Sequence, residues 1–531
     1  MAVATYTTDL TDFEDFEAAN TISTEFTGYT ATSKGDDEDS DFPIQGTQHA
    51  SAEQRTASTG SLGSDYGSNI TWTSGWNFFL WGIFLAPAAV DTDANAGIQM
   101  AVGSSITAYY RWTVGGSDFG RYPYGGWQNF VVDPEVTTGR TTTGAPGTNY
   151  RWVGMLCDVI SAISKGSPYG IDVIRYGRGE LRVIDGQAAA YGTFVGMQGA
   201  NDALAAKWGL FQENAGSYLW KGLISLGTTT AVDFRDSNRD IFIDDTRRVQ
   251  SSFNRIEINH VSSNIEWINI NFTSLGTTAK GEFEMIDDCT FVDEDGVFTD
   301  MSTFIYQSGY DGTGRTWRRC GLVTQGGGTF DSCIFDEASG TVAFLVDDLD
   351  IVDDCVFNSD GTGYAIELDS SMAGNSYTMS GCSFNGYAVT DGSTGNEAIY
   401  NNTGGTVTIS VGSGQIPTVH DEVGSTTIIT ASVDLYIIVK DTNGDPIQDV
   451  QVGIHKTSDR AEIVNQDTDI NGEVDTSYSG TTPESVEVRC RKASSGATKY
   501  KNYSSLQTIA TTIGLSLSIT MIEDPNNNAT T

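Results

Sequence analysis

The stretch Val352-Asp353-Asp354-Cys355-Val356-Phe357 decides the fold, because its pattern of an apolar residue, two small or acidic residues, Cys, any residue and Phe recurs along the middle of the chain. The other copies are Ile286-Asp287-Asp288-Cys289-Thr290-Phe291, Phe330-Asp331-Ser332-Cys333-Ile334-Phe335 and Met379-Ser380-Gly381-Cys382-Ser383-Phe384. The last three cysteines are separated by 22 (355 − 333) and 27 (382 − 355) residues. A period in the twenties with turns of variable length indicates a solenoid.

The Cys and Phe of each copy are two residues apart, so they point to the same face of a strand, which in a parallel solenoid is the interior. A leucine-rich repeat has a similar period but needs a leucine skeleton that this stretch lacks. We therefore expect a right-handed parallel β-helix over residues 231–428. An earlier rung, Trp267–Phe272, would place Ile270 in the cysteine column. The interior ladder would consist of Cys289, Phe291, Cys333, Phe335, Cys355, Phe357, Cys382 and Phe384.

Aromatic residues and glycine pairs crowd residues 71–132, a pattern typical of short antiparallel strands. The segments Val114-Gly115-Gly116-Ser117-Asp118 and Gly125-Gly126-Trp127 resemble the jelly-roll, lectin-like sandwiches of phage structural proteins. This resemblance implies a jelly-roll-like sandwich for residues 1–230. Within it we expect a solvated loop at the acidic run Lys34–Asp41 and short helices within residues 154–164 and 201–211.

Strict alternation of apolar and polar residues begins after Gly424 and predicts a small antiparallel sandwich. The turn Asp441–Ile447, the strand Val450–Ile454 and the later turn Asp469–Gly472 resemble carboxypeptidase-regulatory-like and related Ig-like sandwiches. The resemblance implies an Ig-like spacer or adhesion unit at residues 429–524, without catalytic residues. The tail, residues 525–531, is expected to be disordered unless it docks on another surface.

The composition supports an all-β protein, because Gly is abundant at 60 of 531 residues and charged residues make up only 18%. Lys and Arg number 29 against 69 Asp and Glu, which gives a net charge of −40. Such a field repels phosphate backbones and anionic lipid, so we expect neither nucleic-acid binding nor membrane insertion. Seven sparse cysteines and an N-terminus without a secretory pattern predict a chain that folds in a reducing cytosol.

The sequence gives little support for a metal-binding site. Cysteines spaced one per turn along a solenoid axis, without a nearby His, do not form a tetrahedral zinc site. The run Asp467-Thr468-Asp469-Ile470-Asn471-Gly472 opens like an EF-hand loop, but its twelfth position is Tyr478 instead of Glu. We expect a β-turn there and no cofactor, with calcium at Asp467, Asp469 and Asn471 as the alternative left open.

Two kinds of surface side chain were candidates for function. Asp347, Asp350 and Asp353 could serve as paired carboxylates of a polysaccharide-degrading enzyme, but acidic residues flank nearly every rung, and a solvated face explains them without catalysis. Aromatic rings in the turn-rich parts of the β-helix could stack on sugars, although packing against the strands or covering their edges explains most of them equally simply. These candidates for glycan binding are Tyr306, Tyr310, Tyr364 and Tyr387, with Tyr400 nearby in the sequence.

The combination of two sandwiches, a β-helix, strong acidity and few cysteines resembles tailed-phage virion proteins. This resemblance implies a non-enzymatic structural protein, either a tail fibre or tailspike or a head fibre or decoration protein, that folds in the host cytoplasm and is displayed on the virion. It also implies a homotrimer, contacts with other virion proteins and contact with host-surface glycan. A polysaccharide depolymerase and a bacterial surface adhesin are the alternatives.

Overall fold

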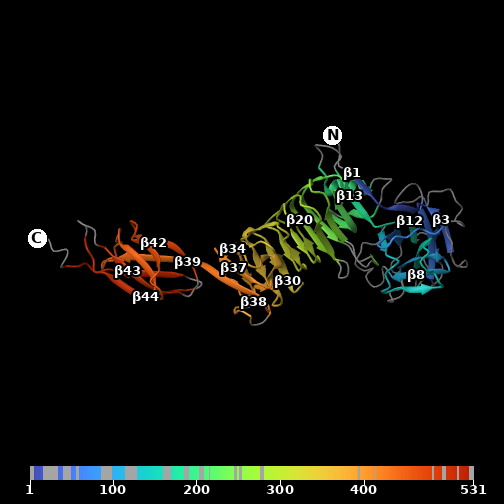
Figure 1. The fold of residues 1–531 in the computed structure, drawn as a ribbon. Coiled ribbons are helices and arrows are strands. Elements are labelled where there is room, and N and C mark those ends of the chain that lie inside the picture. Colours follow the sequence, from blue (N-terminus) through green and yellow to red (C-terminus); the bar gives the residue numbers. More distant parts are fainter. Residues whose placement is uncertain are drawn as a thin grey trace. The chain divides into compact units, whose positions relative to one another are not determined.

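The computed structural model places most of the chain in strands. It describes residues 5–15, 34–39, 49–54, 59–84, 98–113, 128–158, 169–184, 191–202, 208–214, 216–243, 248–249, 254–275, 280–392, 395–412, 414–480, 484–492, 498–510 and 514–525. Strands account for more than half of the described residues and helices for only a few, so the prediction of an all-β protein is confirmed. The chain divides into two compact units, Met1–Gly328 and Thr329–Thr531, which are described separately (Figure 1).

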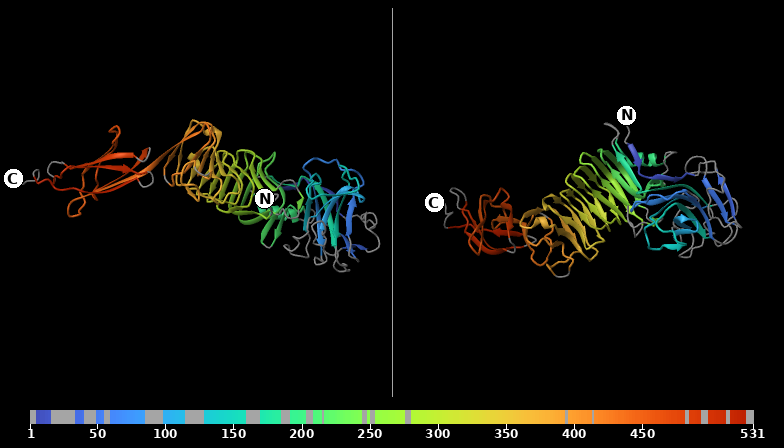
Figure 2. Two further views of the ribbon diagram at one scale, coloured as in Figure 1. Left: turned by 90° about the horizontal axis from the view of Figure 1, so that it is seen from below. Right: turned by 45° about the vertical axis from the view of Figure 1, so that its right-hand side comes forward.

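The first unit begins with two sheets that pair antiparallel except for one short strand, β18 (Figure 2). One sheet has the order β10-β8-β7-β11-β5 and the other β18-β9-β6-β12-β4-β3, with β2 also on β12. Their bounds are β2 Thr11–Glu14, β3 Lys34–Asp39, β4 His49–Gln54, β5 Thr59–Asp65, β6 Asn77–Phe84, β7 Ile98–Ser105, β8 Ala108–Thr113, β9 Gln128–Val132, β10 Thr141–Thr143, β11 Trp152–Asp158, β12 Tyr169–Gly177 and β18 Arg248–Val249.

The two sheets pack face to face around an apolar core. Gly82 of β6 lies so close to the facing sheet that a Cβ built on it would be 3.1 Å from Met155 Sδ of β11. Met155 is buried, and so is Met100, its neighbour on β7 on the same face of the sheet. Close packing of this kind leaves no room for a larger residue at position 82.

The rest of the first unit consists mainly of two parallel sets of strands. One has the order β1-β13-β16-β19-β21-β24-β27, in which only β1 is antiparallel to its neighbour. The other stacks β15, β17 and β20. Beyond β20 it splits into two columns, β22 followed by β25 and β23 followed by β26. The bounds are β1 Thr5–Thr8, β13 Glu180–Ile184, α2 Phe194–Asp202, β14 Phe211–Asn214, β15 Ser217–Trp220, β16 Gly222–Leu226, β17 Asp233–Ile243, β19 Asn254–Ile258, β20 Asn264–Ser274, β21 Gly281–Met285, β22 Thr290–Glu294, β23 Val297–Thr299, β24 Phe304–Ile305, β25 Tyr310–Thr313, β26 Thr316–Arg318 and β27 Val323–Thr324.

The chain passes back and forth between these two sets (Figure 1). Each pass adds one strand to the first set, and beyond β20 it adds two short strands to the second. Parallel pairing already includes β13 and β16, within the range predicted to be the N-terminal sandwich. The long strand β20 aligns Ile265 with Phe291 and Phe272 with Phe298. The predicted alignment of Phe272 with Phe291, and of Ile270 with Cys289, is therefore wrong.

A buried ion pair lies inside this part of the first unit. Arg315 and Asp293 are both fully buried, and Arg315 Nε donates to Asp293 Oδ2 at 2.7 Å. The guanidinium also donates to the Ile270 carbonyl and lies 4.2 Å from the ring centre of Phe298. Burial raises the pKa of Asp293, and Arg315 opposes that shift. The pair satisfies polar groups that would otherwise be desolvated without partners.

The second unit continues with parallel strands before it changes to a sandwich. Its first strands form the orders β30-β33-β36-β38, β29-β32-β35 and β34-β37-β39, with β28 beside β31. The bounds are β28 Thr329–Asp331, β29 Ile334–Asp336, β30 Val342–Val346, η3 Leu349–Ile351, β31 Val352–Asp353, β32 Val356–Asn358, β33 Tyr364–Leu368, η4 Ser370–Met372, β34 Ser376–Met379, β35 Ser383–Asn385, β36 Ile399–Asn401, β37 Thr406–Val411 and β38 Val419–Asp421.

The Cys and Phe residues of the repeat are buried in both units. In the second unit, register aligns Phe335 with Phe357 and Phe357 with Phe384, and their rings stack with centroids 4.7 and 5.3 Å apart. Hydrogen bonding with the thiols of Cys333 and Cys382, together with burial, raises the pKa of Cys355 well above its usual value. In the first unit, Cys289 and Phe291 are also buried. These side chains form the core of the parallel strands.

A single long strand, β39 (Thr426–Lys440), joins the parallel strands of the second unit to its sandwich (Figures 1 and 2). Residues 426–431 pair with β37, and residues 431–440 pair with β42 and β45. The second sheet of the sandwich has the order β41-β40-β43-β44. The bounds are β40 Gln451–Lys456, β41 Glu462–Asp467, β42 Glu473–Gly480, β43 Glu484–Arg491, β44 Tyr503–Ile509 and β45 Leu515–Thr520.

Three local predictions in the first unit are corrected. Lys34–Asp39 is strand β3, paired with β4 at a sheet edge, where charged residues are suited to an edge that must not aggregate. The predicted helix at 154–164 begins inside β11, because pairing with β5 and β7 overrides local propensity. The helix near residue 201 is α2, which ends at Asp202.

Several predictions fall on residues outside the described ranges. These are the glycine-rich segments 114–118 and 125–127, residues 159–164 and 203–207, and the tail beyond residue 525.

Candidate functional site

A cluster of polar and aromatic side chains lies on the outer face of the parallel strands in the second unit. We call it the Tyr–His cluster; its members are Tyr364, Glu397, Tyr400, His420 and Glu422. Strands β33, β36 and β38 pair in parallel and align Glu367 with Tyr400 and Tyr400 with His420. Because parallel strands repeat the same face at each step, outward side chains of distant segments come together in a row.

The rings of the cluster pack closely while remaining partly exposed. Tyr364 and Tyr400 stack with ring centroids 4.6 Å apart and an interplanar angle of 13°. The imidazole of His420 stands edge-on to both, with centroids 5.6 Å from each ring. The His420 side chain is 30% exposed, so the cluster can be reached from solvent.

Hydrogen bonds fix the cluster in place. Tyr364 Oη and His420 Nδ1 are 3.2 Å apart, and the same nitrogen lies 3.5 Å from Glu397 Oε2. The Glu397 side chain is fully buried and accepts a hydrogen bond from the Gly395 amide at 3.1 Å. Tyr400 Oη donates to Glu422 Oε2 at 3.1 Å. The rings are thus preorganised by groups whose own positions are set by the backbone.

The carboxylates give the cluster an acidic character. Burial, followed by Glu397 and Glu422, raises the pKa of Tyr364. Burial, then the hydrogen bond to Glu422, raises the pKa of Tyr400. Burial and the nearby Asp369 also raise the pKa of Glu367, against a hydrogen bond from Asn402. Neutral phenols beside carboxylate acceptors can pack against the apolar face of a sugar ring and accept hydrogen bonds from its hydroxyls.

The other predicted glycan-binding tyrosines lie elsewhere. Tyr306 and Tyr310 are buried inside the first unit with ring centroids 4.0 Å apart, and Tyr310 Oη donates to Asp293. The prediction of a surface role for these two residues is wrong, because Tyr306, which follows β24, and Tyr310, which begins β25, both point inward. Tyr387 is partly exposed and contacts Phe384 edge-on at 6.4 Å. Burial raises its pKa.

The three aspartates considered for catalysis lie near a turn of the second unit. Asp353 is aligned with Asp331 in parallel register, and burial, then Asp331, Asp354 and Asp350, raise its pKa. The side chain of Asp350 accepts a hydrogen bond from the Thr378 amide, so it has a structural role. Asp347 is partly buried.

The turn considered as a calcium site already uses the carboxylate of Asp469 as a hydrogen-bond acceptor for its own backbone. Asp469 Oδ1 accepts hydrogen bonds from the amides of Asn471 and Glu473, at 2.9 and 2.8 Å. Asp467 ends the preceding strand, β41. Across the described ranges, no group of three or more His, Cys, Asp or Glu side chains is arranged to hold a metal ion.

No family model matches the chain, and no curated protein matches it either. Within the described part of the chain, no helix has the length and apolarity needed to cross a bilayer.

Proposed function

We propose that the protein is a non-enzymatic structural component of a tailed-phage particle, exposed on the particle surface, and that it contacts host-surface glycan through the Tyr–His cluster. The observation that carries the glycan role is the stacked pair Tyr364 and Tyr400, held on the solvent face by His420 and two carboxylates. Aromatic rings with adjacent fixed acceptors suit an amphipathic ligand such as a saccharide.

The proposal includes a finer account of the fold. We propose that the alternating parallel strands form a right-handed β-helix, that the N-terminal sheets form a jelly-roll-like sandwich, and that the C-terminal sheets form an Ig-like sandwich. Support comes from the chain's alternation between two parallel strand sets and from the face-to-face packing at Gly82. Such a protein would serve as a rigid spacer that displays its outer side chains.

We also propose a homotrimer that assembles with other virion proteins after folding in the host cytoplasm. Light scattering on the full chain should give three times the chain mass of 56.9 kDa. A monomer in a folded sample contradicts this part of the proposal. Antibody labelling of purified particles should place the chain on their surface, and absence of the chain from particles contradicts the virion role.

Binding of the full chain to an array of immobilised bacterial polysaccharides tests the glycan role. The double substitution Tyr364→Ala with Tyr400→Ala should lower the signal at least tenfold, because it removes both stacking rings. Tyr436→Ala is the matched control, since Tyr436 also bonds to a glutamate, Glu473, but lies in the sandwich. Equal binding by the double variant and the wild type contradicts the assignment.

A second candidate, a polysaccharide depolymerase, is favoured by one observation, the raised pKa of Asp353 among other carboxylates. Two nearby carboxyl groups whose surroundings move their pKa values apart are what glycoside hydrolysis requires. Incubation with the polysaccharides retained on the array should release new reducing ends if this candidate is right, and Asp353→Asn should abolish the release. A bacterial surface adhesin is the remaining alternative, and failure to find the chain in particles would favour it.

A further inference from the structure

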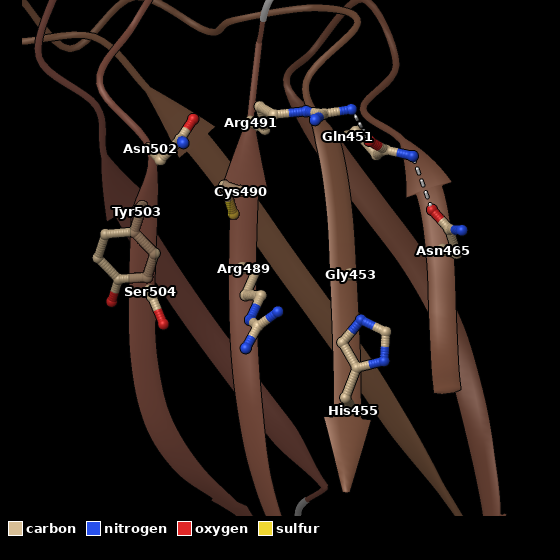
Figure 3. A pocket seen from close by; sticks show the side chains of 10 residues that line it. All are labelled: Gln451, Gly453, His455, Asn465, Arg489, Cys490, Arg491, Asn502, Tyr503 and Ser504. Atoms are coloured by element: carbon tan, nitrogen blue, oxygen red, sulfur yellow. Dashed lines mark hydrogen bonds between the residues drawn. The ribbon is translucent and has the colours of Figure 1, made fainter. Parts of the chain in front are cut away.

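The outer face of the sheet β41-β40-β43-β44 in the C-terminal sandwich contains a hollow of about 340 Å³ (Figure 3). Its centre is Gly453 on β40, where neighbouring strands place Arg489 on one side and Asn465 on the other. Val452 and Ile454 on the same strand are buried on the opposite face. Since side chains alternate along a strand, a glycine at an outward position leaves a gap in an otherwise continuous polar surface.

The space above Gly453 is bounded mainly by a side chain, the imidazole of His455, rather than by backbone. A Cβ built on Gly453 would meet the imidazole edge of His455, with Nε2 at 3.1 Å, and the Val464 carbonyl oxygen at 4.0 Å. Figure 3 shows Arg489 beside Gly453 on the neighbouring strand, and His455 further along the strand of Gly453 itself. A volume of this size lies within the range of about 300–1,000 Å³ typical of small-molecule sites.

The rim of the hollow is rich in hydrogen-bond donors. Arg491 Nη2 donates to Gln451 Oε1 at 3.1 Å, and Gln451 Nε2 donates to Asn465 Oδ1 at 3.0 Å, so three adjacent strands hold one another's side chains in place (Figure 3). The other lining residues are Gly453, His455, Arg489, Cys490, Asn502, Tyr503 and Ser504. None of these ten described lining residues is acidic, in a chain with 69 Asp and Glu against 29 Lys and Arg.

The two arginines that line the hollow contact different groups. Arg489 pairs with Glu487 at 2.7 Å, and Glu487 also pairs with Arg460, so Arg489 already has a carboxylate partner. Arg491 instead donates to a neutral amide, and a ligand oxyanion could take the place of that acceptor. Asp467 lies beyond Gln451, on the far side of the rim from Arg491. Arg491 is therefore the charged group best placed to receive an anion.

We propose that this hollow binds the oxyanion of an acidic sugar residue, with Arg491 as its charged partner. Gln451 and Asn465 would hydrogen-bond the sugar hydroxyls, and Gly453 would provide the space for the ring. Ser504 Oγ, which donates to Glu487 Oε1 at 2.7 Å, would accept a hydrogen bond from a hydroxyl. This site is separate from the Tyr–His cluster and does not depend on it. A carboxylate and a phosphate present the same oxyanion chemistry, so the sugar could be a uronic acid or a sugar phosphate.

Saturation-transfer NMR on the full chain tests the proposal with three probes: galacturonic acid, glucose 6-phosphate and glucose. One or both acidic sugars should show transfer, and glucose should show little. Transfer to galacturonic acid alone identifies a carboxylate ligand, and transfer to glucose 6-phosphate alone identifies a phosphate ligand. Equal transfer to all three probes, or to none, overturns the proposal.

Variants locate the binding. Arg491→Gln should weaken binding of the acidic probe at least tenfold, and Gly453→Val should block it by filling the hollow, while the thermal unfolding midpoint shows that both variants remain folded. Lys440→Gln removes one positive charge from the other sheet and should bind as the wild type does. Unchanged binding by both Arg491→Gln and Gly453→Val overturns the assignment. Tyr400→Ala should leave acidic-sugar binding intact, so failure here is distinguishable from failure of the Tyr–His cluster.

Discussion

The second unit contains two stacks of aromatic rings that differ in where they point. The column Phe335, Phe357 and Phe384 is buried and lacks polar atoms, whereas the pair Tyr364 and Tyr400 lies on the outer face beside His420. Parallel strand pairing produces both, since it brings the same face of successive passes together. The inner stack stabilises the fold, and the outer stack is free to contact another molecule.

Truncating one ring in each stack should give the largest difference in stability between the variants. Phe357→Ala should lower the free energy of unfolding by about 3–5 kcal/mol, because it leaves a cavity in the core. Tyr400→Ala should lower the free energy of unfolding by less than half as much, because the Tyr400 ring is partly exposed. All ten tryptophans precede Thr329, so hydrogen exchange of peptides from β32 and β36 is the suitable measurement for this unit. Equal losses at the two positions would remove the distinction between the stacks.

The same comparison between buried and exposed groups can be made for charged side chains, with a buried and an exposed ion pair of the first unit. Arg315→Met should destabilise this unit by about 3–5 kcal/mol, since it leaves Asp293 buried without its partner. The matched control is Arg319→Gln, which breaks the exposed pair with Asp300 and should cost about 0–1 kcal/mol. Tryptophan fluorescence during denaturant unfolding reports on this unit. A loss for Arg319→Gln as large as that for Arg315→Met would contradict the account.

The cysteines of the inner columns should be protected from alkylation. Burial raises the pKa of Cys289 to about 12, and Cys333 and Cys382 lie buried on either side of Cys355. At pH 8 iodoacetamide should leave these four thiols unmodified in the folded chain and modify them all after unfolding. Peptide mass spectrometry gives the result residue by residue. Rapid modification of Cys355 in the folded protein would show that the column is open to solvent.

The smallest expected effect is on the pH dependence of stability, and it involves the outer tyrosine stack. Burial and Glu422 raise the pKa of Tyr400, so the stability that its neutral form contributes is complete below the unfolded pKa of about 10 and is lost as pH rises through the higher folded pKa. Ultraviolet titration should show a phenol that ionises above pH 10, and Glu422→Gln should lower its pKa. An unchanged titration in that variant would argue against the hydrogen bond.

Sequence spacing predicted the inner column better than it predicted the register. The two-residue interval from Cys to Phe correctly placed these residues on one buried face. The register failed at Phe291, because β20 is long enough to pair with both β22 and β23 and so carries two aromatic columns. A period alone does not reveal which column a given Phe joins. Tyr310 follows Phe291 by 19 residues (310 − 291), and that interval was a signal that it lies inside.

The outer site was harder to foresee. Tyr364 was identified as a candidate, but Glu397 and His420 were not. Residues aligned in β33, β36 and β38 are separated by 33 (400 − 367) and 20 (420 − 400) positions, so no regular period links them. The turns between the strands set these lengths, and their conformations depend on tertiary contacts.

The central claim is that the outer tyrosine pair, and not the buried rings, contacts glycan. The most direct measurement is the NMR spectrum of the full chain with ¹³C-labelled tyrosine rings, recorded as a saccharide retained on the array is added. The account predicts shifts for the rings of Tyr364 and Tyr400 and none for the buried Tyr306 and Tyr310. Shifts that spare Tyr364 and Tyr400, or the absence of any retained saccharide, would contradict it.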